Sequence, residues 1–240
     1  MRQYLKIFPA FAIHLASLVG CVESANAQEN PVTAIDIMLE PDTTMVREAE
    51  AGNSRLLKAY PGGFALDATH HAHLTMIQQF VRTADLEKVY SAANAVLANE
   101  GVASWKLRAF KYYYIPSPPL GIAGIVIERT EGLLRLQSEL LDAVAPFTEK
   151  TGTAAAFIST DNGRDIQQGL IDYVANFATV AAGKNFNPHV TIGVAPVTYL
   201  NEMFAEPFNA FTFSPVGAAV YQLGSFGSAR KELQALSLTP

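Results

Sequence analysis

Two short stretches of this sequence carry the residue types needed for acid/base chemistry. Both follow the pattern His-x-Thr-x with apolar residues at x, and they comprise residues 73–76 and 189–192. An imidazole exchanges protons near neutral pH because its unperturbed pKa lies close to 7, and a hydroxyl can donate a hydrogen bond to an anionic oxygen. Together the two stretches could supply two proton-transfer groups and two hydroxyls to one site.

Each stretch is predicted to lie on a buried strand. Side chains alternate between the two faces of a strand, so His73 shares a face with Thr75, and His189 shares a face with Thr191. If the strands lie side by side, the imidazoles flank a cleft that suits in-line displacement at phosphorus. One histidine would remove a proton from the attacking oxygen and the other would protonate the leaving oxygen. The threonine hydroxyls would hold the non-bridging oxygens.

Four other residues are candidates for substrate contact. His71 and Asn187 each lie two positions before a motif histidine, so in a regular strand they would face the same cleft. Tyr112 and Tyr114 lie on an aromatic strand, where alternation separates them from Tyr113, and their rings could stack on a nucleobase.

The histidines at 70, 71 and 73 allow a metal site as a different interpretation, since neutral imidazole is a good zinc ligand. Against it, His70 and His71 are adjacent and would point to opposite faces of a strand. No neighbouring Asp-His pair completes a familiar metallohydrolase pattern. No metal ligand is therefore predicted.

The motifs at 73–76 and 186–192 resemble the paired H-x-T motifs of the 2H phosphoesterase superfamily. The resemblance is to its bacterial RNA 2′,3′-cyclic phosphodiesterase and 2′-5′ RNA ligase-like branch. Residues 221–224 and 226–229 resemble the same branch, and the order of strands and helices is similar over residues 32–238.

This resemblance implies an α+β, pseudo-symmetric two-lobed LigT-like fold, with mainly antiparallel sheets around a central cleft and helices outside. It also implies metal-independent, cofactor-free hydrolysis of 2′,3′-cyclic phosphate ends of nucleotides or short RNA. His73 and His189 would be the acid/base pair, in roles the sequence does not assign, and Thr75 and Thr191 the phosphate ligands. A 2′-5′ RNA ligase, a non-catalytic module that binds a phosphorylated ligand, and a zinc-dependent hydrolase remain as alternatives.

Composition limits the partners. The chain has 240 residues, half of them hydrophobic, with a formal net charge of −5, which indicates a globular protein rather than a disordered one. An acidic chain has no broad electrostatic attraction for a nucleic-acid backbone, so a small nucleotide or a chain end is expected instead of extended nucleic acid. No partner protein is evident.

Residues 1–27 have the pattern of a secretory signal peptide. A positive start is followed by an apolar run and by Ala25-Asn26-Ala27, a small-x-small cleavage signal. Removing them takes away two positive charges and one negative, from −5 to −6. The expectation is a periplasmic or secreted chain in which residues 28–240 form a single two-lobed domain. Alternatively, residues 18–21 resemble a lipobox that would anchor the chain through Cys21, its only cysteine.

Alternating and helical patterns place the motifs in a mixed order of elements. Strands are predicted at 35–39, 68–81, 105–115, 121–128, 188–194, 211–213 and 218–223, and the strands at 105–115 and 121–128 should form a hairpin-like pair. Helices are predicted at 43–60, 84–98, 131–149, 165–182 and 198–205. No linker-like segment separates the halves, so the two lobes should be tightly joined.

Overall fold

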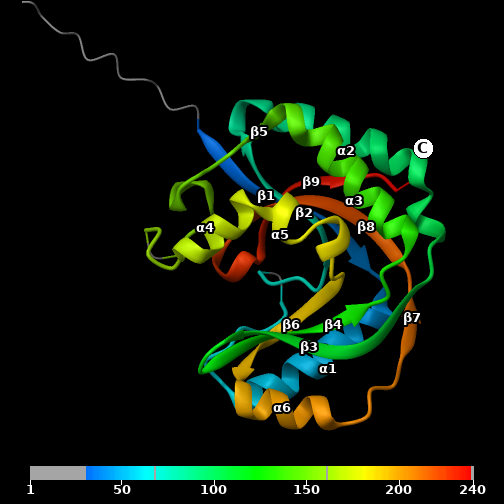
Figure 1. The fold of residues 1–240 in the computed structure, drawn as a ribbon, viewed down its shortest axis with the longest axis vertical. Helices are drawn as coiled ribbons and strands as arrows, with labels where there is room; N and C mark the ends of the chain where they lie inside the picture. Colours follow the sequence, from blue (N-terminus) through cyan, green and yellow to red (C-terminus); the bar gives the residue numbers. More distant parts are fainter. Residues whose placement is uncertain (1–30, 68, 161, 239–240) are drawn as a thin grey trace, which may run out of the picture.

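One curved antiparallel sheet forms the centre of the protein (Figure 1). The computed structural model describes residues 31–67, 69–160 and 162–238, so the expected signal peptide and Cys21 lie outside the described residues. The strands are β1 (Val32–Pro41), β2 (Leu74–Arg82), β3 (Leu107–Ser117), β4 (Leu120–Ile127), β5 (Thr148–Glu149), β6 (His189–Pro196), β7 (Phe211–Phe213), β8 (Pro215–Leu223) and β9 (Ala229–Leu236). Their order is β7-β3-β4-β6-β2-β1-β8-β9, and β5 pairs with β2 off this path.

The sheet divides into two lobes that meet between β2 and β6. One lobe has the order β2-β1-β8-β9 and the other β6-β4-β3-β7, so each begins with a motif strand at the junction. Within the described residues, the register between β2 and β6 consists of one antiparallel pair, Leu74 with Val190. Among these residues, the two lobes of the sheet are therefore joined through this single pair.

Helices cover the outer face of each lobe. The helices are α1 (Thr43–Ala59), α2 (Leu86–Glu100), α3 (Glu131–Val144), α4 (Gln168–Ala175), α5 (Phe177–Val180) and α6 (Val197–Ala205). In Figure 1, α2 and α3 cover the lobe of β1 and β2, and α1 and α6 cover the lobe of β3, β4 and β6. This is the expected α+β arrangement of antiparallel strands around a cleft with helices outside, and the fold class is confirmed.

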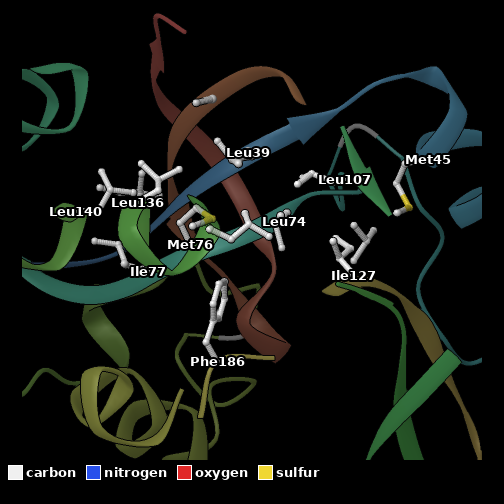
Figure 2. Close-up of a cluster of buried hydrophobic side chains, with 14 of the residues drawn as sticks. Leu39, Met45, Leu74, Met76, Ile77, Leu107, Ile127, Leu136, Leu140 and Phe186 are labelled. Atoms are coloured by element: carbon white, nitrogen blue, oxygen red, sulfur yellow. The ribbon is translucent and has the colours of Figure 1, made fainter. Parts of the chain in front are cut away.

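The apolar residues of both motifs lie in the core, as alternation predicts. Leu74 and Met76 are buried against α3, where Figure 2 shows them near Leu136 and Leu140. Val190 and Ile192 are likewise fully buried. Removing these side chains from water stabilises the strands by about 1.5–3 kcal/mol each, and it turns the polar side chains of the motifs toward the opposite face.

Most predicted elements are present, including the antiparallel pair of β3 and β4. Three predictions need correction, and two of them concern helices. The helix predicted at 165–182 is two short helices separated at Asn176, whose side chain donates to the carbonyl of Asp172. An amide that bonds to nearby backbone competes with helix continuation. The helix predicted at 131–149 ends at Val144, and Thr148–Glu149 forms β5 instead.

The first motif strand begins later than alternation suggests. β2 starts at Leu74, so residues 69–73 form an irregular approach and His73 lies immediately before the strand. In the second motif His189 is the first residue of β6. No helix in the part of the chain described here is both long enough and apolar enough to cross a membrane.

Candidate functional site

The two motifs pass each other where the lobes meet. Leu74 of the first motif pairs with Val190 of the second. The motif histidines and threonines are the residues directly before and after these two, so all four lie close to the junction. His73 acts electrostatically on His189, which indicates that the two imidazoles are near each other.

Both imidazoles are held in the same way. The Nδ1 atom of His73 lies 2.7 Å from the carbonyl oxygen of His71, and the Nδ1 atom of His189 lies 2.7 Å from that of Asn187. A carbonyl can only accept a hydrogen bond, so Nδ1 carries the proton in both rings. The reactive Nε2 atom of each neutral ring is then left with its lone pair, as a proton-transfer group needs.

Each motif strand has a β-bulge directly after its threonine. The extra residues are Met76 in β2 and Ile192 in β6. The flanking pairs are Thr75–Met38 and Ile77–Ile37 in one lobe, and Thr191–Gly124 and Gly193–Ala123 in the other. Bulges bend a strand and redirect its side chains, and they are common beside active sites. Here they occur at matched positions, so the pseudo-symmetry extends to local backbone geometry.

A buried amide side chain satisfies each bulge. Gln137 of α3 donates to the carbonyl of Met76 at 3.0 Å, and its Oε1 accepts from the amide of Gly183 at 3.1 Å. Asn53 of α1 donates to the carbonyl of Ile192 at 2.9 Å, and its Oδ1 accepts from the amide of Leu66 at 3.1 Å. Each amide thus connects the bulge after one threonine to the loop that leads to the other motif.

Asp36 of β1 lies beside the first motif, near His73 and Thr75. Its side chain is fully buried. Its Oδ2 accepts hydrogen bonds from the Thr75 hydroxyl at 2.7 Å and from Gln78 at 2.9 Å. The Nε2 atom of His73 lies 3.6 Å from the same oxygen, a distance that makes an ion pair when the ring is protonated but is too long for a hydrogen bond.

In the part of the chain that the structure describes, the second half has no carboxylate at the matched position. Ile122 and Val194 form the register pair that corresponds to Asp36 and Gln78, three positions beyond each motif threonine. Among the residues that the structure describes, no hydrogen bond involves the Thr191 hydroxyl. Its proton is available to a ligand, whereas the hydroxyl proton of Thr75 is already donated to Asp36.

An aromatic ring packs on His189 instead. Tyr113 lies edge-on to it, with 4.8 Å between ring centroids. The ring reaches this position over Gly124, where a Cβ atom would lie only 2.8 Å from Tyr113 Cε1. Burial raises the pKa of the Tyr113 hydroxyl, and a hydrogen bond with the Asn187 side chain opposes that shift.

These different surroundings shift the two histidine pKa values in opposite directions. Burial is the largest single effect and lowers the pKa of His73, but the Asp36 carboxylate and the His71 carbonyl together outweigh it and raise the pKa above the ordinary value. Burial lowers the pKa of His189, and the nearby His73 lowers it further, against the raising effect of the Asn187 carbonyl. Relative to a free histidine, the surroundings therefore favour the protonated form of His73 and the neutral form of His189.

The remaining predicted residues divide into two groups. Asn187 reaches the site through its carbonyl and through its side chain on Tyr113. His71 packs against Tyr221 of β8, at 5.7 Å between centroids, and its carbonyl holds His73. Tyr112 and Tyr114 are not brought to the histidines, because both pack on α6 around Phe204, and Tyr113 faces the site instead.

The histidine cluster does not converge on a metal position. His70 stacks on Phe64 at 4.7 Å between centroids, whereas His71 lies on Tyr221. Over the described ranges, no three side chains of His, Cys, Asp or Glu come together as metal ligands.

Sequence reasoning missed Asp36, Gln78, Asn53 and Gln137. The first was visible only as the single acidic residue in an otherwise apolar strand at 35–39. A charged residue in such a strand is rarely buried without a partner, and that was the available signal. The two helix residues, Asn53 and Gln137, carried no sequence signal of burial, since a polar residue on a helix is usually solvated.

Solved structures share this arrangement of elements. The structure of TT0787 from Thermus thermophilus is 16% identical over 86% of this chain and 98% of that one, with a TM-score of 0.54. The structure of Escherichia coli LigT complexed with NADP+ is 11% identical over 86% of this chain and 99% of that one, with a TM-score of 0.41. The likeness to TT0787 shows a common fold. No family model and no curated protein sequence matches this chain.

Proposed function

We propose that this protein is a metal-independent phosphoesterase that hydrolyses 2′,3′-cyclic phosphate ends of nucleotides or short RNA. The observation that carries the proposal is the pair of histidines, each with Nδ1 held by a carbonyl and with pKa values shifted in opposite directions. One protonated and one neutral imidazole at a single site are the two states that acid/base displacement at phosphorus needs. The fold and the two H-x-T motifs, which resemble those of 2H phosphoesterases, support the same chemistry.

In this proposal the two roles follow from the opposite directions of the pKa shifts. Neutral His189 accepts a proton at Nε2 from a water molecule as the water oxygen attacks phosphorus. His73 donates its Nε2 proton to the ribose oxygen as the bond between phosphorus and that oxygen breaks. The products are a phosphomonoester and a free hydroxyl, and proton exchange with solvent restores both rings.

The hydroxyls contribute unequally in this scheme. Thr191 donates to a non-bridging oxygen of the phosphate. Thr75 holds Asp36 in place, and Asp36 keeps His73 protonated. A protonated His73 offsets the negative charge of Asp36, so the carboxylate does not repel the single negative charge of a cyclic phosphodiester. Export to the periplasm or the medium, as the first 27 residues suggest, would direct the activity toward nucleotide ends outside the cytoplasm.

The test is turnover of 2′,3′-cyclic nucleotides by the purified protein, followed over pH with and without a chelator. The proposal expects a bell-shaped profile of kcat/KM that the chelator does not change. Loss of turnover on chelation would indicate a metal-dependent hydrolase, and joining of RNA ends would indicate a ligase. Tight binding with no turnover at any pH would indicate a binding module and would contradict the proposal.

A further inference from the structure

Phe226 is an exposed aromatic residue in a constrained backbone position. Its side chain is 64% exposed, although it is large and apolar. Its φ of 59° and ψ of 14° lie in the left-handed region, which a non-glycine residue rarely adopts. Such a conformation persists only where neighbouring structure imposes it, and it is enriched at ligand-binding positions.

The turn that holds Phe226 is braced on both sides. The amide of Gly224 donates to the carbonyl of Ser228 at 2.9 Å, and the Ser228 hydroxyl donates to the carbonyl of Ser225 at 2.9 Å. Gly227, with a φ of 72°, leaves room for Leu170 of α4. These contacts fix the ring of Phe226 toward solvent instead of letting the turn relax and bury it.

The same turn is connected to the catalytic cleft. The Nε2 atom of Gln78 lies 3.4 Å from the carbonyl oxygen of Gly227 and 2.9 Å from Oδ2 of Asp36, to which it donates. Asp36 in turn holds Thr75. Phe226 is thus one residue away from a hydrogen-bond network that ends at the first motif.

Two more aromatic rings extend the surface toward the first motif. Phe64 lies 6.5 Å from Phe226 between ring centroids, and His70 stacks on Phe64 with planes 15° apart. Both belong to the loop that leads to His73. Tyr173 of α4, which is 40% exposed, lies close enough to Asp36 for the carboxylate to add to the effect of burial on its pKa, which rises to about 12. The edge of the cleft beside the first motif is therefore lined with aromatic rings.

We propose that Phe226, supported by Phe64 and His70, is the platform on which the nucleobase of the substrate stacks. This rests on the proposed function, because it presumes that the phosphate lies between the two histidines. A base has a flat face that stacks on an aromatic ring without needing charge, which suits an acidic protein. It also makes the preferred substrate a cyclic phosphate that bears a base, not a cyclic phosphate ester in general.

The experiment compares two substrates and two variants. The substrates are a 2′,3′-cyclic nucleotide and the 2′,3′-cyclic phosphate of a methyl riboside, which has no base. Phe226→Gly removes the ring while suiting the left-handed backbone, so the protein should fold at least as stably as the original. Val216→Ala is the matched control, because Val216 is 65% exposed at the other end of β8.

The expected result is a loss of about tenfold in kcat/KM for the nucleotide in Phe226→Gly, mainly through KM. The loss should be confined to the base-bearing substrate, and Phe226→Trp should retain affinity. Val216→Ala should leave both substrates unaffected. An equal loss on both substrates, or no loss on either, would overturn the platform while leaving the proposed function intact.

A binding measurement separates the two proposals if the protein turns over neither substrate. Calorimetry measures the affinity of the protein for a nucleoside 3′-phosphate and for the base-free ribose phosphate, and the difference between the two affinities tests the platform without turnover. Tighter binding of the base-bearing ligand by the original protein, lost in Phe226→Gly, supports the platform although the proposed function has failed. Equal binding of both ligands overturns the platform as well.

Discussion

In the first lobe the motif histidine has a buried carboxylate beside Nε2, whereas in the second lobe an aromatic ring packs against it. The supporting framework is the same in both lobes: a carbonyl on Nδ1, a bulge after the threonine, and a helix amide on the bulge. The difference arises at one matched register pair, Asp36 with Gln78 in one lobe and Ile122 with Val194 in the other. A symmetric framework thus holds two chemically different imidazoles.

The difference between the lobes matters because acid/base catalysis needs opposite protonation states at the same pH. Two identical half-sites would give neither imidazole a preference for the acid role or the base role. The buried carboxylate lies 3.6 Å from Nε2 of His73 and raises the pKa of that ring, whereas burial is the main cause of the lowered pKa of His189.

The largest expected effects come from removing the imidazoles. His73→Ala and His189→Ala should each lower kcat by about 10²–10⁴-fold, because each removes one proton-transfer step. The pH profiles should differ: His189→Ala loses the acidic limb, which the neutral base produces, and His73→Ala loses the basic limb. Steady-state kinetics across the acidic, neutral and basic range on both variants measures this. Loss of the same limb in both would contradict the assigned roles.

The shared framework should respond equally in both lobes. Asn53→Leu and Gln137→Leu each leave a buried carbonyl without its partner, and each should lower the free energy of unfolding by about 1–3 kcal/mol. Urea unfolding of the two variants measures the loss. Asn99→Leu is a suitable control, since its amide bonds only to an exposed helix carbonyl. A large loss in one lobe and none in the other would show that the framework is not symmetric.

Asp36→Asn should make the two histidines more alike. Removing the negative charge lowers the pKa of His73, so the proton that His73 must donate is lost at lower pH. The basic limb of kcat/KM should therefore move to lower pH, while the acidic limb, set by His189, should move less, because Asp36 is the smallest of the effects on the pKa of His189. On the basic limb, activity at a fixed pH should fall by about tenfold if the pKa of His73 falls by about one.

Glu232→Gln is the matched control for this change, since its carboxylate belongs to the same lobe but contacts Tyr221. If it moves the basic limb as far as Asp36→Asn does, the contact between Asp36 and His73 is not the cause.

The threonines should differ by a smaller amount. Thr191→Val removes a hydroxyl whose proton is free for the phosphate, and it should raise KM by about tenfold. Thr75→Val should raise KM less, because the Thr75 proton is given to Asp36. Each threonine replaced by serine keeps the hydroxyl and should restore KM. A larger rise in KM for Thr75→Val would mean that Thr75 turns to the phosphate in the bound state.

The smallest effects are expected two positions before each histidine. His71→Ala and Asn187→Ala preserve the backbone carbonyl that holds Nδ1, so kcat should stay within about threefold of the original. Asn187→Ala should have the larger effect of the two, because its side chain also contacts Tyr113. A loss well beyond this range at either position would show direct contact of that side chain with substrate.

Local pattern was sufficient for much of the fold and for the faces on which the motif residues lie. Strand alternation is set by the backbone of neighbouring residues, so it correctly placed His73 and Thr75 on one face and Leu74 and Met76 in the core. The same reasoning divided the tyrosines of β3 between two faces. It could not say which face met the histidines, because aromatic residues occupy both faces and give no contrast in hydrophobicity.

The sequence by itself determined the pair of motifs, the type of chemistry they allow and the α+β class. The tertiary structure decided which histidine has the carboxylate, because Asp36 reaches Thr75 from 39 positions earlier in the chain. It also set the bulges and the buried amides, which depend on strand register and helix packing across lobes. A pKa depends on all the groups around a side chain in space, so the histidines of two similar motifs acquired pKa shifts of opposite direction only when the chain folded around them.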